Sequence, residues 1–281
     1  MASARDIRRR IKSIKNIQQI TKAMKMVAAA RLRRAQERAA SSRPYTEKIQ
    51  EVLGHVIANV RDLSHPLLTV REVSKTGYLI IGADKGLAGA YTSNVIREVL
   101  PQVRGNDKAV IVAVGRKPRD YFRKRGYHVL DEYTGFSERP TYDHAVIIAK
   151  EIARRFIAGD LDEVKLVYTK FYSPINQKPT TMTLLPLEHD SSEHNQTEYI
   201  FEPSAPEVLG QLLPKYLETV IYGALLQAAA SELGARMAAM ESATDNAQEL
   251  ISKLVLNYNK MRQASITLEI SEIVGGAEAL K

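Results

Sequence analysis

The stretch SELGARMAAMESATDNAQELISKLVLNYNKMRQASITL, residues 231–268, repeats an apolar side chain in alternating steps of three and four residues. Nine of its eleven repeat positions are apolar over five heptads, and the positions are Leu233, Met237, Met240, Thr244, Ala247, Ile251, Leu254, Tyr258, Met261, Ser265 and Leu268. Such a sustained repeat is typical of a coiled-coil seam rather than of an ordinary amphipathic helix. The stretch therefore predicts a helix from about residue 206 to residue 274, with Gly275 and Gly276 as its stop signal.

A second long helix is predicted near the start of the sequence, over residues 3–60. Its apolar residues keep steps of three or four, apart from a gap where Gln18 and Thr21 interrupt the stripe, and they are Ile7, Ile11, Ile14, Ile17, Met24, Ala28 and Leu32, then Tyr45, Ile49, Val52, Val56 and Val60. Pro44 is expected to kink or restart this helix, because proline cannot donate an interior hydrogen bond. Roughly 60 helical residues extend about 90 Å, which is too long for a compact domain. The two narrow seams therefore predict that the terminal helices pair with each other in antiparallel fashion.

Residues 77–205 change from helical periodicity to short β-branched runs. The predicted strands are YLIIGA (78–83), AVIVAVG (109–115), YHVLDEY (127–133) and VKLVYTKFY (164–172), with TTMTLLPL (180–187) and YIFEP (199–203) as edge strands. Because helical stretches such as TYDHAVIIAKEIARRFIAG lie between the strands, a parallel sheet is favoured. The predicted fold is α/β plus long helices: an antiparallel coiled coil of an N-terminal helix (1–60) and a C-terminal helix (206–281), with a central Rossmann-like α/β domain (77–205).

The positive charge of the chain is concentrated near its N-terminus. The net charge is +8, and residues 1–43 hold thirteen basic and only two acidic residues. This asymmetry favours an acidic partner. The absence of cysteine excludes disulfides, thiolate metal sites and cysteine nucleophiles. No apolar run approaches the roughly 20 residues of a membrane span, and no apolar segment follows the basic N-terminus as in a signal peptide, so a cytosolic protein is the default expectation.

The glycine-rich stretch IGADKGLAGAYTSN lies between a predicted strand and a predicted helix, where phosphate-binding loops occur. It is not a Walker A loop, because neither Ser nor Thr follows Lys85. The spacings of four and three between Gly82, Gly86 and Gly89 also depart from the two and three of the dinucleotide-binding fingerprint. A tight strand-to-helix turn is the favoured interpretation, and its charged side chains could dock a partner.

No other pattern predicts chemistry in the chain itself. The six histidines are scattered, and the polar loop around His189 and His194 is a poor cage for a metal. No serine stands in a G-x-S-x-G motif, and no pair of carboxylates stands out as an acid and a base. We therefore expect no catalytic, cofactor-binding or metal site.

The basic N-terminal helix leaves three interpretations open. It could be a solvated face, which is the usual role of a charge run, or the arm of a nucleic-acid-binding protein, although it lacks interleaved aromatic residues and a recognisable motif. It could also be a shaft helix, with one stripe on its coiled-coil partner and a basic face toward acidic protein. A further alternative for the whole chain is an orphan α/β enzyme with a coiled-coil dimerisation module, which the glycine spacings disfavour.

Three motifs, taken in order, resemble the gamma-subunit family of F-type ATP synthases over essentially the whole chain. RDIRRRIKSIKNIQQITKAMKMVAAARLRRAQ resembles the opening helix of the family, and ITKAMKMVAA (20–29) is its most typical part. GADKGLAGAYTSN resembles the central loop of the family, usually written G-S-D-R-G-L-C-G. ITLEISEIVGGAEA fits the C-terminal signature at Ile266, Thr267, Glu269, Glu272, Gly276, Ala277 and Ala279. Relative to the family pattern, Ala88 replaces a frequent cysteine and Lys85 replaces an arginine, so a thiol is lost and the charge is kept. The cysteine-bearing regulatory insertion of chloroplast relatives is absent, and the resemblance therefore implies a bacterial enzyme without thiol control, at the cytoplasmic face of the plasma membrane.

The resemblance implies a central rotor shaft that couples ion flow to ATP synthesis or hydrolysis by rotation and has no active site of its own. The implied partners are three alpha and three beta subunits around the coiled coil, the epsilon subunit and the c ring, with no nucleic acid and with the membrane reached only through the c ring. The implied contacts with the alpha/beta ring are Ile7, Ile11, Ile14, Met24, Lys25, Asp84, Lys85, Gly86, Ala88, Arg262, Gln263, Ile266, Thr267, Glu269 and Glu272. The implied foot, near the epsilon subunit and the c ring, contains Tyr199, Phe201 and Glu202.

Overall fold

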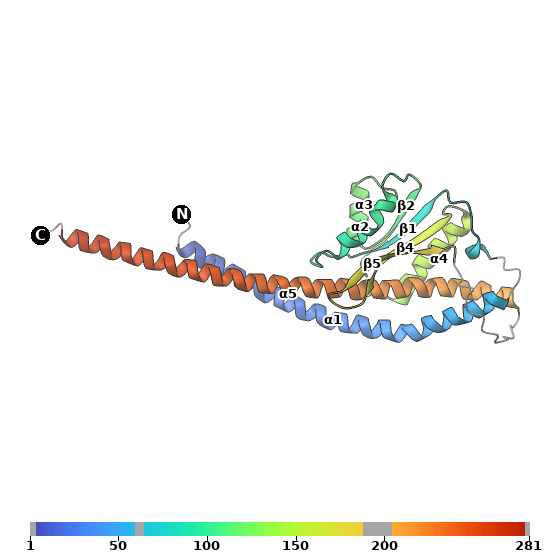
Figure 1. Cartoon of the computed structure of the whole chain (residues 1–281), viewed down its shortest axis with the longest axis horizontal. Coiled ribbons are helices and arrows are strands. Elements are labelled where there is room, and N and C mark those ends of the chain that lie inside the picture. The colour runs from blue at the N-terminus through green and yellow to red at the C-terminus, as the bar shows by residue number, and fades with distance from the viewer. Residues whose placement is uncertain (1–3, 60–64, 188–203, 279–281) are drawn as a thin grey trace. The chain divides into compact units, whose positions relative to one another are not determined.

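A computed structural model describes residues 4–59, 65–187 and 204–278 of the chain (Figure 1). In chain order the elements are α1 (Ala4–Asn59), the short 3₁₀ helix η1 (Pro66–Leu68), β1 (Thr76–Ile81), α2 (Tyr91–Val103), β2 (Ala109–Val114), α3 (Arg116–Lys124), β3 (Val129–Tyr133), α4 (Tyr142–Ala158), β4 (Glu163–Phe171), β5 (Gln177–Leu185) and α5 (Ala205–Glu278). The chain divides into two compact units, one made of Met1–Val27 with Met237–Lys281, and the other of Ala28–Arg236. Each unit is described by itself.

The first unit is the predicted antiparallel pair of helices. Buried and partly buried side chains on α5 recur in steps of three and four residues, at 240, 244, 247, 251, 254, 258 and 261. Buried and partly buried side chains on α1 recur in the same way, at 7, 11, 14, 18 and 21. Side-chain hydrogen bonds between the helices join Gln18 to Gln248 and Lys25 to Glu241. A later residue of α1 thus contacts an earlier residue of α5, which means that the two helices are antiparallel. The seam predicted from the sequence is thus confirmed as far as Met261, whereas the last two repeat positions are exposed.

The gap in the apolar stripe of α1 is a polar layer within the seam. Thr21 is buried and its hydroxyl lies 2.8 Å from that of Thr244, while the amide of Gln18 donates to Gln248 at 2.8 Å. Ile17, which the sequence placed in the stripe, is instead exposed. The spacing of apolar residues alone does not predict this layer, because hydroxyl and amide groups that pair across the helices can occupy the same heptad positions. Such a layer fixes the register, because sliding the helices would leave these groups unpaired.

Helix-breaking residues do not interrupt the long helices. Pro44 lies inside α1 and Pro214 lies inside α5, and both helices continue through these residues. The predicted stop at Gly275 and Gly276 is wrong, because α5 continues to Glu278. Glycine ends a helix where the chain needs a left-handed residue to turn back, and the described part of α5 makes no such turn.

The second unit contains a five-stranded sheet of order β3-β2-β1-β4-β5. β1 pairs in parallel with β2 and β4, β2 pairs in parallel with β3, and β5 joins β4 in antiparallel fashion. The first four predicted strands correspond to β1–β4, and the run at residues 180–187 falls largely in β5, which is an edge strand as predicted; β3 forms the other edge. The other predicted edge strand, at residues 199–203, lies outside the described residues.

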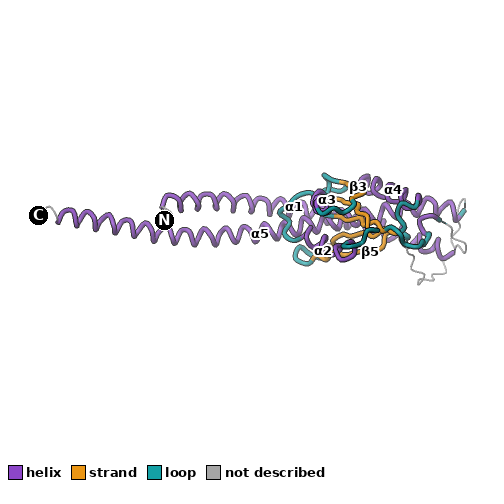
Figure 2. Tube along the Cα trace, turned by 90° about the horizontal axis from the view of Figure 1, so that it is seen from above, coloured by secondary structure: helices purple, strands orange, loops and turns teal. Residues whose placement is uncertain are grey.

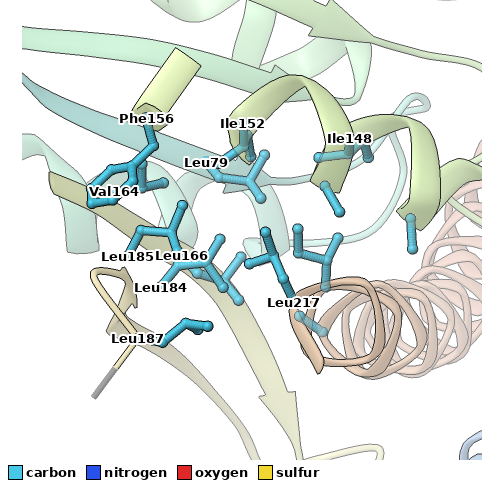
Figure 3. Packing of buried hydrophobic residues seen from close by; sticks show 14 of the residues in the cluster. Leu79, Ile148, Ile152, Phe156, Val164, Leu166, Leu184, Leu185, Leu187 and Leu217 are labelled. Carbon is cyan, nitrogen blue, oxygen red and sulfur yellow. The ribbon is translucent and has the colours of Figure 1, made fainter. Parts of the chain in front are cut away.

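Helices cover both faces of this sheet, and each strand sends alternate side chains to the two faces. Leu79 and Ile81 of β1 face one core, with α4 and the first half of α5, whereas Tyr78 and Ile80 face the other, with α2 and α3. Figure 3 shows the first core, in which Leu79, Ile152, Leu166 and Leu217 point toward one another. The continuous burial of β1 and β2 on both faces explains why their sequences are apolar without interruption.

Local signals set the ends of α4. At its start, Thr141 and His144 form a capping box, in which each side chain reaches the backbone of the other residue. At its end, Gly159 takes a left-handed conformation with a φ of 80°. This conformation costs little free energy only for glycine, which has no Cβ. The chain therefore turns sharply from α4 toward strand β4, the neighbour of β1 in the sheet.

Candidate protein-interaction surfaces

The crevice where a doubly wound sheet usually binds its ligand is filled by α5 of the same chain. In such sheets the ligand lies at the carboxyl ends of the strands, where the strand order reverses, and here the reversal falls between β1 and β4. The backbone N–H of Phe171, at the end of β4, donates to the side chain of Gln227 at 3.0 Å. The hydroxyl of Ser231 donates to the carbonyl oxygen of Thr169 at 3.1 Å. Small residues on α5 let the helix lie this close, and that accounts for the alanine-rich stretch in its middle.

At the carboxyl edge of the sheet, a carboxylate of the chain itself accepts the backbone hydrogen bonds that a bound phosphate would need. Asp84, after β1, is buried, and its side chain accepts hydrogen bonds from the backbone N–H groups of Arg116 (3.1 Å), Gly135 (2.8 Å) and Ser137 (3.0 Å). Arg116 is the first residue of α3, where helix N–H groups usually bind anions. Burial alone would raise the pKa of Asp84, but the three backbone hydrogen bonds outweigh it and lower the pKa. The interpretation of this loop as a tight turn is therefore favoured over a phosphate loop.

The turn after Asp84 presents a different set of side chains from the one expected. Ala88 is buried beside Ala83 and Tyr91, so the side chains of Asp84 and Ala88 face into the chain. Lys85 is exposed, and Leu87 is 62% exposed with a φ of 63°. A bulky residue in the left-handed region is strained, and such strain is found at functional sites. The sequence did not identify Leu87, because a backbone conformation is not visible in residue types.

A cluster of ion pairs, which we call the hub, lies behind this turn. Glu138, which follows β3, pairs with Arg31 of α1, with Lys85 at 3.2 Å and with Arg236 of α5 at 3.3 Å. Arg236 also pairs with Glu232 at 2.7 Å. Burial would raise the pKa of Glu138, but the hydrogen bond from Lys85 and the nearby arginine charges lower it. Burial raises the pKa of Glu232 despite the hydrogen bond from Arg236.

The end of α5 has no cover within the described chain. Every residue from 262 to 277 is exposed, including the predicted contacts Arg262, Gln263, Ile266, Thr267, Glu269 and Glu272. The apolar ones among the exposed residues are Ile266, Leu268, Ile270, Ile273 and Val274, and Ile273 is 71% exposed. Figures 1 and 2 show α5 extending past the start of α1 within their unit. An apolar helix end left in water marks a surface that a protein partner covers.

The contacts predicted on α1 are buried or partly covered within this unit. Ile7 is buried in the seam, and Ile11, Ile14 and Met24 are partly covered. The ammonium group of Lys25 lies 2.6 Å from Glu241. The large apolar side chains that α1 exposes in this unit are instead Ile17, Ile20, Met26 and Val27. The sequence pattern placed Ile17 in the seam and did not identify the other three. In the structure, Gln18 and Thr21 take the seam positions, and Ile17 therefore lies outside the seam.

Other predicted features remain outside the surfaces above. Tyr199, Phe201 and Glu202 lie outside the described residues. In the described ranges, no group of three or more His, Cys, Asp and Glu residues could hold a metal ion. None of the helices among the described residues is long and apolar enough to cross a membrane.

A paired helical shaft with an uncovered apolar end, and an α/β unit whose crevice is filled by its own helix, define a protein that works by holding other proteins. The chain belongs to the ATP synthase family, whose model matches residues 3–280. It is 53% identical to the ATP synthase gamma chain of Desulforamulus reducens and 51% identical to that of Heliobacterium modesticaldum, over the full length of each pair.

Solved structures carry the same fold. A chain of the Euglena gracilis mitochondrial ATP synthase aligns with a TM-score of 0.74 at 20% identity, over 99% of this chain and 94% of that one. A chain of the Tetrahymena thermophila mitochondrial ATP synthase central stalk and c ring aligns with a TM-score of 0.62 at 24% identity, over 80% of this chain and 99% of that one.

Proposed function

We propose that this chain is the central rotor shaft of a bacterial F-type ATP synthase and that it couples ion flow to ATP synthesis and hydrolysis by rotation. Its partners are a ring of three alpha and three beta subunits, the epsilon subunit and the c ring. The observation that carries the proposal is the uncovered end of α5, with Ile273 at 71% exposure, in a chain of the ATP synthase family. Such a helix end needs a protein sleeve.

Rotation acts through differential binding. A component can bias the conformation of another only if it binds the alternatives with different free energies. The paired helices present unlike faces, with the α5 end apolar and the N-terminal stretch of α1 strongly basic. Each beta subunit therefore meets a different face of the shaft at any instant, and the three nucleotide sites differ in consequence.

The ring contacts are proposed for positions that are exposed or only partly covered within the chain. The α5 end supplies Arg262, Gln263, Ile266, Thr267, Glu269 and Glu272, and α1 supplies Met24, Lys25, Ile11 and Ile14. At the turn after β1, Lys85 and Gly86 remain candidates and Leu87 joins them, whereas the buried side chains of Ile7, Asp84 and Ala88 act by shaping the surface.

The division of labour follows the three predicted segments. Residues 1–60 and 206–281 form the shaft, and residues 77–205 carry the foot. The foot would include Tyr199, Phe201 and Glu202 near the epsilon subunit and the c ring. The chain would then lie at the cytoplasmic face of the bacterial plasma membrane as a peripheral protein.

The two rival functions fit less well. An orphan α/β enzyme would need an open crevice at the carboxyl edge of the sheet, and α5 and Asp84 occupy it. A nucleic-acid-binding arm gives no reason for the exposed apolar side chains of α5. It also predicts duplex or single-strand binding that weakens steeply with salt.

Co-expression with ATP synthase alpha and beta subunits tests the proposal. We expect the full chain to give a stable complex with ATPase activity, and a chain that ends after Met261 to lose assembly or activity. Because no described residue covers residues 262–277, this truncation should leave the circular dichroism of the α/β unit intact. An unassembled full-length chain, or a truncated chain that assembles equally well, would contradict the proposal and reopen the rivals.

A further inference from the structure

One turn of α5, at residues 234–236, receives three loops of the α/β unit. The β4–β5 hairpin, the turn after β1 and the loop after β3 all meet it. The first contact is steric and the other two are polar, and both kinds depend on the exact position of this turn along the helix axis.

The steric contact is at Gly234. A Cβ added there would lie 3.0 Å from Nε2 of Gln177, 3.2 Å from Cε2 of Phe171 and 3.3 Å from the backbone Cα of Pro174. By contrast, a Cβ added at Gly210 or Gly223 of the same helix would meet nothing within 4 Å. A glycine inside a helix is destabilising relative to alanine, so Gly234 is costly for the helix, and the close hairpin explains it.

The polar contacts are made by Arg236. Its guanidinium group pairs with Glu232 at 2.7 Å and with Glu138 at 3.3 Å, and Nη2 donates to the carbonyl oxygen of Gly86 at 3.3 Å. Glu138 is tied in turn to Lys85 and to Arg31 of α1. The planar fork of arginine suits several fixed acceptors at once, which the single ammonium group of lysine does not.

We propose that Gly234, Arg236 and Glu138 form a torque clamp, which locks the α/β unit to the helix on which it sits. The inference rests on the proposed rotor function, since it concerns how torque passes between the shaft and the foot. Apolar packing along α5 is non-directional and holds two surfaces together without fixing their position along the axis. A hairpin seated on a glycine resists displacement sterically, and a buried arginine that contacts two carboxylates and a carbonyl loses these contacts if it moves along the axis. These three are positioning residues and touch no nucleotide.

The test uses the assembled enzyme in inverted membrane vesicles, with ATP hydrolysis and ATP-driven proton pumping measured on the same preparation. Glu138→Gln removes the central charge at nearly constant volume, and Gly234→Ala inserts the missing Cβ. Glu151→Gln is the matched control for the first, because Glu151 pairs with arginines of its own helix α4. Gly223→Ala is the matched control for the second.

The clamp predicts that Glu138→Gln and Gly234→Ala keep most of the unloaded ATPase activity but lower protons pumped per ATP by about fivefold or more. Arg236→Lys should give an intermediate ratio, and both controls should match the wild type. If Glu138→Gln or Gly234→Ala fails to assemble, the other of these two variants and Arg236→Lys decide the question. A normal ratio in assembled variants that only melt earlier would overturn the clamp and leave the rotor function standing. Failure of the wild-type chain to couple would instead overturn both.

Discussion

Replacing Asp84 with alanine is expected to destabilise the α/β unit severely. The buried carboxylate accepts three backbone hydrogen bonds, from Arg116, Gly135 and Ser137, at 2.8–3.1 Å. A part-buried N–H left without an acceptor costs about 1 kcal/mol or more, and hydrogen bonds to a charged acceptor are the stronger kind. We therefore expect a loss of about 3–4 kcal/mol, which for a unit of this size lowers the melting temperature by about 10 °C.

The assay is thermal unfolding of the full chain followed by circular dichroism, with Asp107→Ala as the control. Asp107 is exposed in the turn before β2, so its removal should change stability by less than about 0.5 kcal/mol. Because the pKa of Asp84 is lowered in the folded chain, its stabilisation is present above the unfolded pKa and is lost as the pH falls through the folded pKa. The difference from wild type should therefore shrink as the pH falls below the pKa of an unfolded aspartate. A loss no larger than that of the control, or a difference that grows in acid, would refute the assignment.

Three more substitutions test other parts of the structure. Leu254→Pro should cost about 3 kcal/mol or more in the helix pair, and a far-UV spectrum and melting curve like those of wild type would refute it. Gly223→Ala should raise stability by about 0.5–1 kcal/mol because it has room for a methyl group in a helix, and a lower melting temperature would contradict this. Met24→Lys should disturb coupling more than folding, because it adds a charge at a proposed contact with the ring. Equal losses of hydrolysis and of ion pumping, with their ratio intact, would count against it.

The parts of the fold that were predicted correctly follow from the periodicity of apolar residues. The steps of three and four from Leu233 fixed the α5 seam, and the β-branched runs fixed β1–β4, because burial repeats with the period of the element that is buried. The polar layer of Thr21 and Thr244 broke this rule. Their value to the seam lies in pairing across two helices, which no single helix displays.

The hub could not be predicted for a related reason. Glu138, Arg236 and Lys85 are far apart in the sequence, and each looks like an ordinary charged surface residue until the fold brings them together. The inward direction of Asp84 was hidden as well, since a loop carboxylate can serve either a partner or its own backbone. The clearest clue available in the sequence was Gly234, a costly residue within a strong helical repeat.

Amide hydrogen exchange across α5 tests the central claim most directly, by comparing the isolated chain with the chain assembled with alpha and beta subunits. Residues 262–277 have no covering helix in the described chain, and isolated helices of this length are marginal in water. The account predicts fast exchange there in the isolated chain, slow exchange in the seam from Met240 to Met261, and strong slowing of residues 262–277 on assembly. Exchange at residues 262–277 that is already as slow as in the seam, or that does not change on assembly, would contradict it.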